Sequence, residues 1–407
     1  MNVTDERLDH GSPDGVGGLF ARTAALDAAV ARFASAQLGP LPVPLVFVAL
    51  VYLANLAINV VSNPPPGFDD RQQLAEMGWW AWGYSGVQPP LHTWLIKLVD
   101  LVVESDIAAI YVTRFTVLFL LATTLYRIGR ELQLSRQGAA AAALGLFLMP
   151  TVGWEAQRTF SHSLSGMLFT ALFQLAFLVL LRRRTTGTYV LAGSSAALAV
   201  LGKYNSLVAL AGSAAAGIAL PAVRRALRVR GLFAAAVAFL AILAAPLFWL
   251  AAGRIETLDD SADKFGFHGT GSLLHDRLTG LADFAFQTLA YCGPLLGVAL
   301  AAAFLARLDG RAVRGAFGRL GPETRYLATA IGASFALALL LVLASGTTEL
   351  KGYWFHPILI TLPAAVAAIL EVYDRTGWAN RLIVFCGALL ALASIVAFVI
   401  RTSGIGS

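Results

Sequence analysis

Blocks of about twenty apolar residues recur along this chain and constrain its fold more than any other feature. An α-helix needs about that many apolar residues to cross the hydrocarbon core of a bilayer. Hydrophobic residues make up 57% of the 407 residues and charged residues only 13%, far from the composition of a soluble domain. The sequence therefore predicts an all-helical protein that crosses a membrane about eleven times, with segments at 42–62, 107–126, 137–152, 164–182, 188–203, 205–222, 232–252, 282–305, 326–345, 355–371 and 382–400.

Residues 1–40 differ from the rest of the chain because they are polar or mixed. They lack the small-residue cleavage site of a secretory signal peptide, so the first span is expected to stay in the protein. Between Leu19 and Leu38, apolar residues at helical spacing fit a helix in the membrane interface, and a frayed polar tail fits equally well. We therefore divide the chain into a cytoplasmic tail, residues 1–40, and a transmembrane domain, residues 41–407, whose first outer loop is 63–106.

Lys and Arg are shared unevenly between the two sets of loops. One set, which includes the N-terminal tail, holds most of them, and such loops stay on the cytoplasmic side. The other set contains Asp69 and is predicted to face the periplasm or cell exterior, from a bacterial inner membrane. The net charge of +6 is spread over loops and does not indicate nucleic acid. Both cysteines fall inside apolar segments, so neither a disulfide framework nor a cysteine metal site is indicated.

The stretch Asn63–Leu95 is a long polar interruption that follows the first span directly. It reads NPPPGFDDRQQLAEMGWWAWGYSGVQPPLHTWL and combines two adjacent carboxylates, Asp69 and Asp70, with four tryptophans and two proline clusters. Irregular backbone is not tolerated in lipid, so this stretch is expected at the membrane surface, where Trp and Tyr are favoured. From Leu91 onward, one helix face is apolar and the other carries Lys97 and further charged residues, which predicts an amphipathic helix parallel to the membrane. An ordinary extramembrane loop is the alternative interpretation.

The order of these parts resembles the first outer loop of the GT-C glycosyltransferases. The resemblance is to the bacterial branch with protein mannosyltransferases and the lipid A aminoarabinose transferase (glycosyltransferase families 39 and 83), where the loop typically reads D-E-x-x-Y-x-x-W, then G-Y, then H-P-P-L or K-P-P-L. Asp69 and Asp70 stand at the acidic pair, and Gln88 replaces the His or Lys before the two prolines. The resemblance implies a GT-C-like bundle with interfacial helices in this loop, and it places Asp69 at the catalytic position.

The other outer loops add polar residues at positions where this family has functional ones. The sequence FSHSL stands where the family often has T-P-D-x-P-L, so His162 occupies an expected acidic position. Residues 202–204, GKY, match the family's S-K-Y, although a lysine that anchors the end of a span is the alternative interpretation of Lys203. The last outer loop holds Lys351 and Trp354, and related enzymes have a basic residue and W-x-x-P there. Solvated side chains are the ordinary alternative for such a loop.

Arg114 is a separate case because it lies inside the second apolar segment. A charge in a transmembrane segment is costly unless it is paired or close to water. Two interpretations stay open from the sequence. Either the side chain reaches the outer interface, or it faces the site as the partner of a phosphate or a carboxylate.

Glycosyl transfer from a lipid carrier has two chemical needs that these residues meet. A carboxylate accepts a proton from the acceptor hydroxyl as it attacks the anomeric carbon, and cations stabilise the departing polyprenyl phosphate. The catalytic candidates are Asp69 and Asp70. The candidates for binding the donor phosphate are Lys203, Arg158, Lys264, Lys351 and Arg114, and those for other substrate contacts are Arg71, Tyr84, Gln88, Glu155, His162, Tyr204, His268, Trp354 and His356.

The resemblance thus predicts a glycosyltransferase that moves a sugar, with inversion, from a polyprenyl-phosphate-sugar donor to an envelope acceptor: lipid A or another glycolipid, a glycan or a protein. No cofactor is indicated, and the question of a divalent metal stays open. A membrane transporter or flippase for a lipid-linked or small anionic substrate is the alternative. A transporter is expected to show related halves and ionisable residues near the membrane midplane, whereas the polar residues here cluster toward one face.

Overall fold

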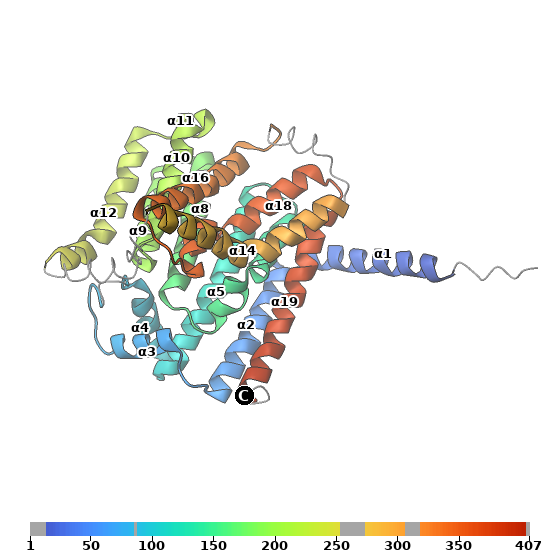
Figure 1. Ribbon diagram of the computed structural model, residues 1–407, viewed down its shortest axis with the longest axis horizontal. Coiled ribbons are helices and arrows are strands. Elements are labelled where there is room, and N and C mark those ends of the chain that lie inside the picture. Colours follow the sequence, from blue (N-terminus) through green and yellow to red (C-terminus); the bar gives the residue numbers. More distant parts are fainter. Residues whose placement is uncertain (1–13, 85–87, 253–272, 306–317, 404–407) are drawn as a thin grey trace, which may run out of the picture.

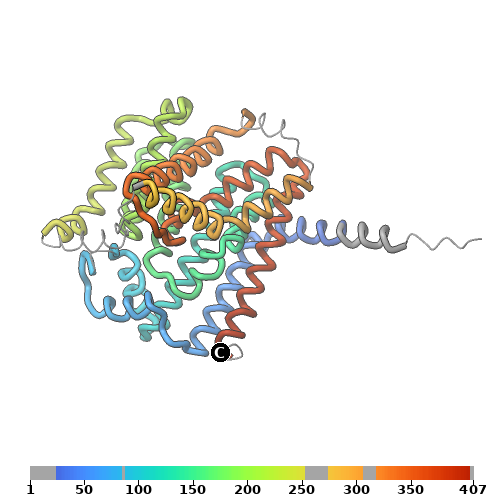
Figure 2. Tube along the Cα trace, viewed as in Figure 1, coloured from blue at the N-terminus to red at the C-terminus, as the bar shows by residue number. Residues whose placement is uncertain are grey.

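The computed structural model describes residues 14–84, 88–252, 273–305 and 318–403, and the described part is a bundle of helices (Figure 1). Seven helices are long and apolar enough to cross a membrane: α2 (Val43–Ser62), α5 (Asp106–Glu131), α8 (His162–Arg183), α12 (Val229–Ala251), α14 (Leu273–Leu305), α16 (Pro322–Ser345) and α19 (Trp378–Thr402). Helices α2 and α19 run side by side although they lie at opposite ends of the sequence (Figure 2). The prediction of an all-helical protein with many membrane spans is confirmed.

Four further predicted segments are present in shorter or bent form. Two helix pairs bend sharply at a break. The first pair bends by 83° between α6 (Arg136–Leu144) with η1 (Gly145–Leu148) and α7 (Pro150–Gly153) with η2 (Glu155–Gln157). The second pair bends by 53° between η3 (Gly352–Phe355) with α17 (His356–Leu359) and α18 (Leu362–Tyr373). Two more are short apolar helices, α9 (Thr186–Gly202) and α10 (Ser206–Ala219). The first break falls where Pro150 begins α7, since proline removes an amide donor and disfavours a helical residue before it. Length and composition alone support seven spans, or nine with the bent pairs, and the two short helices match the rest of the eleven predicted segments.

Small residues let α8 and α9 cross closely at the end of the bundle that carries the first outer loop. A Cβ atom on Gly202 would lie 2.6 Å from the backbone nitrogen of Gly166, and one on Gly166 would lie 2.6 Å from Cβ of Lys203. Helices in membranes commonly associate through such small residues, because the backbones can then approach. Gly202 and Lys203, at the end of α9, therefore pack directly against the first turns of α8.

The chain between the N-terminus and the first span is a helix followed by a small hairpin. Helix α1 (Asp14–Ser35) projects from the side of the bundle (Figure 1). After it, β1 (Gln37–Leu38) pairs with β2 (Leu41–Pro42) before α2 begins. The side chain of Asp27 holds α1 to the start of α19 through two hydrogen bonds from Arg381, of 2.6 and 2.7 Å. Of the two interpretations of this segment, the helical one is confirmed, and its place in the membrane interface stays a prediction.

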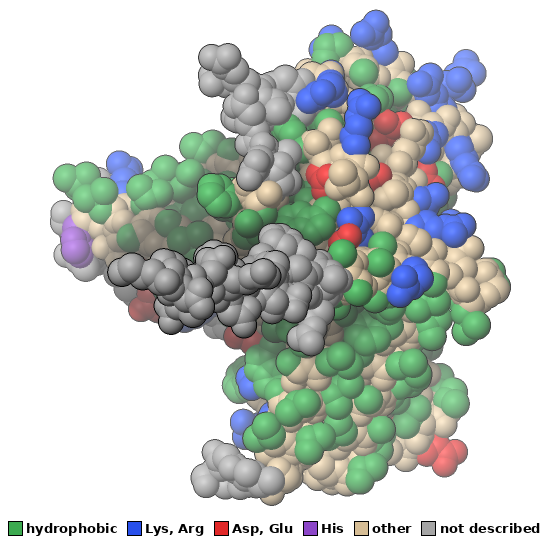
Figure 3. All heavy atoms as spheres, turned by 90° about the vertical axis from the view of Figure 1, so that its right-hand side faces the viewer, with side chains coloured by type: hydrophobic (Ala, Val, Ile, Leu, Met, Phe, Trp, Pro, Cys, Tyr) green, Lys and Arg blue, Asp and Glu red, His purple; other side chains and the backbone are tan. Residues whose placement is uncertain are grey.

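The described parts of the two predicted sets of loops lie at opposite ends of the bundle. At one end, Arg182 of α8 contacts Glu131 of α5 at 3.6 Å and Glu323 of α16 at 3.3 Å, which brings three helix ends together. Lys and Arg side chains gather at the upper end of the molecule in Figure 3, above a broad apolar surface. Helices α3 (Phe68–Glu76) and α4 (Leu91–Val103) of the first outer loop lie at the other end (Figure 1).

Helix α4 corrects the sequence prediction for its polar face. Its apolar residues Leu98, Leu101 and Val102 are exposed, whereas Lys97 is only 9% exposed. The ammonium of Lys97 donates to the carbonyl of Met77 and lies 5.0 Å from the ring of Trp80, so its charge is satisfied inside the protein. The expected amphipathic helix exists, but Lys97 of its predicted polar face is turned into the protein, whereas Leu98, Leu101 and Val102 face outward, as expected of side chains that contact lipid. The six-residue helix α11 (Pro221–Ala226) completes the described elements.

Candidate active site

The two adjacent carboxylates of the first outer loop lie in the first turn of α3. Asp70 accepts a hydrogen bond of 3.1 Å from the backbone nitrogen of Gly67, the residue that caps this helix. Acidic side chains are favourable in a first helical turn because they face the positive end of the helix dipole. Neighbouring residues of a helix point in different directions, so Asp69 and Asp70 have different surroundings.

Asp70 is enclosed and paired. It is 2% exposed, and its carboxylate forms a hydrogen-bonded ion pair with Arg114 of α5, which is 1% exposed. Arg114 also donates to the carbonyl of Arg158 at 3.3 Å. Arg114 therefore does not reach the interface: of its two interpretations, the carboxylate partner is the one observed. Asp70 is committed to this pair, which does not suit a base that must be open to substrate.

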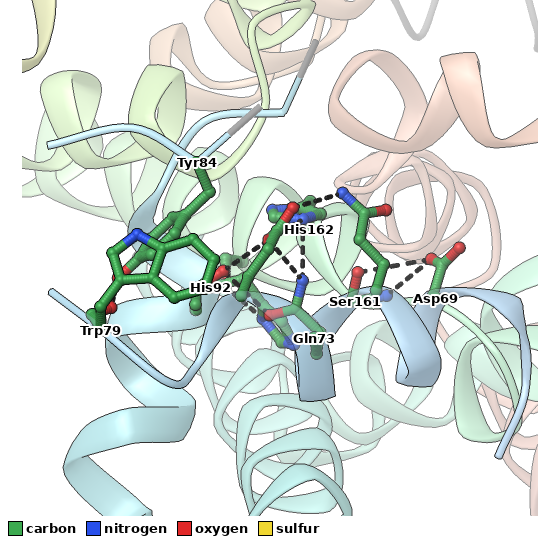
Figure 4. Close-up of polar contacts among 11 residues, drawn as sticks. Asp69, Gln73, Trp79, Tyr84, His92, Ser161 and His162 are labelled. Carbon is green, nitrogen blue, oxygen red and sulfur yellow. Dashed lines mark hydrogen bonds and ion pairs between the residues drawn. The ribbon is translucent and has the colours of Figure 1, made fainter. Parts of the chain in front are cut away.

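Asp69 is half-buried and lies beside the loop that precedes α8. Its Oδ2 accepts hydrogen bonds from the backbone nitrogen of Ser161 at 3.1 Å and from the Ser161 hydroxyl at 3.4 Å (Figure 4). Burial raises the pKa of Asp69 above its usual value, and the Ser161 hydrogen bond and the charge of Lys203 oppose that rise. The carboxylate thus combines a fixed orientation with raised basicity, as a general base needs.

Lys203 points toward the same region from the end of α9. Its ammonium donates to the hydroxyl of Ser163 at 2.5 Å and to the carbonyl of Tyr353 at 3.3 Å, and it lies 4.5 Å from the centre of the Tyr353 ring. Burial lowers the pKa of Lys203 to about 7, and the charge of Asp69 opposes that shift. Although Asp69 and Lys203 influence each other electrostatically, they form no ion pair in the described part of the chain. The two opposite charges are held apart.

A buried polar network behind Asp69 was missed by the sequence analysis. Gln73 Nε2 lies 3.0 Å from His162 Nε2, and the hydroxyl of Thr93 donates to Gln73 at 3.0 Å and to Glu76 at 3.3 Å (Figure 4). His92 Nδ1 lies 2.8 Å from the hydroxyl of Ser165. This network joins α3, α4 and α8. The spacing 69, 73 and 76 on one helical face was the signal that would have found it.

His162 takes part in this network. It is 3% exposed and lies between Gln73 and Glu76, whose carboxylate is 4.0 Å away. Burial raises the pKa of Glu76, and hydrogen bonds from Gln72, Thr93 and Gln73 oppose the rise. This side chain supports the loop from within the protein, and the expected substrate contact of His162 stays a prediction.

A pocket of about 400 Å³ lies next to Tyr353. Its lining combines charged, amide and aromatic residues from three stretches of the chain: Pro150, Thr151, Glu155, Gln287, Ala290, Tyr291, Leu350, Lys351, Gly352 and Tyr353. The carboxylate of Asp283 accepts a hydrogen bond of 2.5 Å from the backbone nitrogen of Leu350 and one of 3.4 Å from the side chain of Gln287. These two bonds hold the wall of the pocket in place. The pocket is within the size range of small-molecule sites. Tyr353, which lines it, also contacts Lys203.

Two of the predicted cationic residues are placed apart from Lys203. The guanidinium of Arg158 lies 4.9 Å from the ring of Trp154, and burial, followed by the charge of Arg401, lowers its pKa. Lys351 lines the pocket and lies 3.8 Å from Glu349. Lys264 and His268 lie outside the described residues. The structure therefore brings Lys203 to Asp69, and Lys351 with Glu155 to the adjoining pocket.

The remaining predicted contacts divide between surface and interior. Arg71 is exposed, Gln88 is partly buried, and the hydroxyl of Tyr84 donates to the carbonyl of Trp79 at 3.0 Å. Tyr204 packs, partly buried, against an apolar cluster that includes Leu201, and the carbonyl of Trp354 accepts from Asn205 at 2.9 Å.

His356 is fully enclosed, with its ring 5.1 Å from that of Phe160 and 5.5 Å from that of Tyr291. This residue begins α17 inside the bundle and does not lie in a solvated loop, and its expected substrate contact stays a prediction. In the described part of the chain, no three His, Cys, Asp or Glu residues are grouped as metal ligands.

Known proteins match both this sequence and this fold. The family model described as dolichyl-phosphate-mannose-protein mannosyltransferase matches residues 87–249. Two relatives from Rhizobium johnstonii are named lipopolysaccharide core galacturonosyltransferase RgtB and RgtA. The first is 25% identical over 82% of this chain and 66% of its own length, and the second is 28% identical over 77% and 62%. The chain thus spans somewhat less than two thirds of the length of these relatives.

The crystal structure of ArnT from Cupriavidus metallidurans bound to undecaprenyl phosphate has a similar fold. Its TM-score is 0.59, with 14% identity, over 88% of this chain and 70% of that chain. The described helices and these matches define a multi-pass membrane protein with the GT-C glycosyltransferase fold. Within that class, the chain is similar to the bacterial ArnT and protein mannosyltransferase type, which confirms the resemblance found in the sequence.

Proposed function

We propose that this protein transfers a sugar from a polyprenyl-phosphate donor to an acceptor of the bacterial cell envelope. The named activities of the relatives, lipopolysaccharide core galacturonosyl transfer, support transfer to an envelope glycolipid. The undecaprenyl phosphate bound to the similar ArnT structure supports a lipid-phosphate donor. A uronic acid on a polyprenyl phosphate is accordingly the first donor to test.

The observation that carries this proposal is the separation of Asp69 from Lys203. A base and a cation that face one region without contact can receive a substrate between them. Asp69 accepts the proton of the acceptor hydroxyl while the oxygen of that hydroxyl attacks the anomeric carbon of the donor sugar. The bond from that carbon to the phosphate oxygen breaks, and the electron pair leaves with the phosphate, whose charge Lys203 stabilises. One displacement of this kind inverts the anomeric centre.

The other charged residues take supporting places in this proposal. Arg114 holds Asp70, and through it the first turn of α3, so it acts on Asp69 as a positioning residue. Asp69 is then the base, and Asp70 is not. Arg158 and Lys351 keep their proposed affinity for anions, Arg158 near Trp154 and Lys351 at the pocket next to Tyr353. The site opens toward the end of the bundle with fewer Lys and Arg, which we assign to the periplasmic side of the inner membrane.

The test is sugar transfer by the purified protein in detergent or nanodiscs, supplied with a polyprenyl-phosphate sugar and lipopolysaccharide core acceptors. Asp69→Asn keeps the size of the side chain but removes the proton acceptor. We expect transfer to fall about a hundred- to ten-thousandfold, while binding of the donor is kept. Asp106→Asn, which neutralises an exposed carboxylate at the start of α5, is the matched control and should stay active. Full activity of Asp69→Asn would exclude Asp69 as the base.

A further inference from the structure

The pocket next to Tyr353 contains hydroxyl groups that have no partner within the protein. The hydroxyls of Thr151, in α7, and Tyr291, in α14, are buried and without a hydrogen-bond partner among the described residues. Thr151 is 9% exposed and Tyr291 is fully enclosed. A buried polar group without a partner is unfavourable, because it has lost its hydrogen bonds to water and gained none in return. Two such groups in the lining of one pocket indicate that a ligand completes their hydrogen bonds.

The rest of the lining defines the chemistry of that ligand. Glu155 and Gln287 present a carboxylate and an amide, which bind hydroxyl groups, and Tyr353 presents an aromatic ring. Gly352 leaves room in the wall, because a Cβ atom there would lie 3.4 Å from Gln287 and 3.5 Å from Thr151. Polar groups around an aromatic surface suit a molecule with many hydroxyls and an apolar ring face. A monosaccharide has this chemistry.

The position of the pocket connects it to the reaction. Tyr353 lines the pocket, and the same residue contacts Lys203 through its ring and its carbonyl. A ligand that extends from the pocket past Tyr353 therefore reaches the ammonium that we assign to the donor phosphate. Asp283, which fixes Leu350 and Gln287, keeps this wall in place.

We propose that this pocket binds the sugar ring of the donor, and that Thr151 and Tyr291 hydrogen-bond its hydroxyl groups. This inference rests on the function proposed above and adds to it the site that holds the transferred sugar. The lipid phosphate lies outside the pocket, on the Lys203 side of Tyr353. Thr151, Tyr291, Glu155 and Gln287 then decide which sugar is accepted.

The experiment removes only the hydroxyls. Tyr291→Phe and Thr151→Val keep the shape of each side chain, and neither breaks a hydrogen bond within the described protein. We expect the KM for the sugar donor to rise about two- to tenfold in each variant, which is the effect of one neutral hydrogen bond. The inhibition constant of polyprenyl phosphate without a sugar should stay unchanged. The melting temperature should be unchanged or higher, because an unpartnered buried hydroxyl is lost.

The matched control is Tyr326→Phe in α16. Tyr326 is also fully enclosed, but its hydroxyl donates to Gln174 at 3.1 Å, inside the bundle. This variant should lower the melting temperature and leave the KM for the donor unchanged. Tyr291→Phe is expected to show the opposite result, a higher KM for the donor with an unchanged or higher melting temperature. This difference would distinguish a hydroxyl that contacts the ligand from one that stabilises the fold.

Two results would overturn the inference. One is an unchanged KM for the donor in both pocket variants. The other is an equal weakening of sugar-free polyprenyl phosphate, which would assign the pocket to the lipid phosphate. If the native protein transfers no sugar at all, the proposed function fails first. Direct binding of the sugar donor and of the sugar-free carrier to the native and variant proteins then tests the pocket by itself.

Discussion

Two neighbouring aspartates of this protein differ because of residues far away in the sequence. Asp70 is held by Arg114, whereas Asp69 is held by Ser161 and stays half-buried. The sequence placed both in a candidate catalytic pair, and the family pattern favoured Asp69. Which carboxylate is enclosed depends on the packing of α3 against α5, and local sequence does not determine that packing.

We expect Asp70→Asn to destabilise the protein strongly. Removing one member of a buried ion pair leaves the other charge buried without compensation, at a cost of about 3–5 kcal/mol. The measurement is reversible denaturation in detergent, or melting of the helical signal where refolding is incomplete. Asp69→Asn is the control, since this half-buried side chain has no arginine partner and its loss should affect folding less. Equal stability of the native protein and Asp70→Asn would contradict the structural role of the Asp70–Arg114 pair.

Lys203 gives the reaction a specific pH dependence. Its pKa is lowered to about 7 by burial, so its charge is present below that pH and lost above it. We expect kcat/KM to fall as the pH rises through about 7, because the free protein then loses the cation for the donor phosphate. Bound phosphate stabilises the protonated amine, so the corresponding fall in kcat should lie at higher pH.

The acidic side of the pH profile belongs to Asp69, whose pKa is raised by burial. Activity should rise with pH as this carboxylate loses its proton. Lys203→Arg, whose side chain keeps its charge over this whole range, is the control for the alkaline side. An alkaline fall near pH 7 that persists in Lys203→Arg would show that another group titrates there.

At the scale of helices, the contact between α8 and α9 positions the cation. A Cβ atom on Gly166 would lie 2.6 Å from Cβ of Lys203, so Gly166→Ala must displace one helix or the other. Overpacking of this kind costs about 1–3 kcal/mol. We expect Gly166→Ala to raise the KM for the donor as Lys203 moves, with a smaller effect on the KM for the acceptor.

Gly332→Ala in α16 is the matched control, because a Cβ atom there would have open space around it. In a helix this change is worth about 0.5–1 kcal/mol in favour of alanine. The control should therefore be as stable as the native protein or more stable, with unchanged kinetics. A Gly166→Ala variant with native kinetics would mean that Lys203 does not depend on this crossing.

The first outer loop shows what can be predicted from sequence at this scale. The polar stretch, its acidic pair and the amphipathic helix were all predicted, because they follow from local composition and spacing. The buried side of α4 was not, since both lipid and protein interior accept apolar residues and the pattern does not tell them apart. The Gln73–Glu76–Thr93 network was missed because each of its members is ordinary by itself. It becomes a site only where α3, α4 and α8 meet.

For the molecule as a whole, hydropathy predicted the positions of the eleven apolar segments, because a bilayer requires long apolar helices. It did not predict the two sharp bends, which depend on prolines within apolar sequence and on the packing around them. Both bent helix pairs contribute to the pocket beside Tyr353. The first pair supplies Glu155 near its end, and the second pair begins at Gly352.

The arrangement of charges at the two ends of the bundle makes a prediction for the intact cell. Loops rich in Lys and Arg stay in the cytoplasm, so the end with Arg182 should be inside and the end with Asp69 outside. Gly78, after α3, and Gly187, at the start of α9, are exposed positions where an added Cβ has no close neighbour. Single cysteines at these positions, in a background without Cys292 and Cys386, should react differently with a membrane-impermeant thiol reagent.

We expect labelling of Gly78→Cys in cells whose outer membrane has been made permeable, and labelling of Gly187→Cys only after the inner membrane is also opened. The cysteine-free background is the control for non-specific reaction, and it must retain the activity of the native protein. Reaction of Gly187→Cys in cells with an intact inner membrane would reverse the orientation. Asp69 and Lys203 would then face the cytoplasm, and a donor presented on the periplasmic side could not reach them.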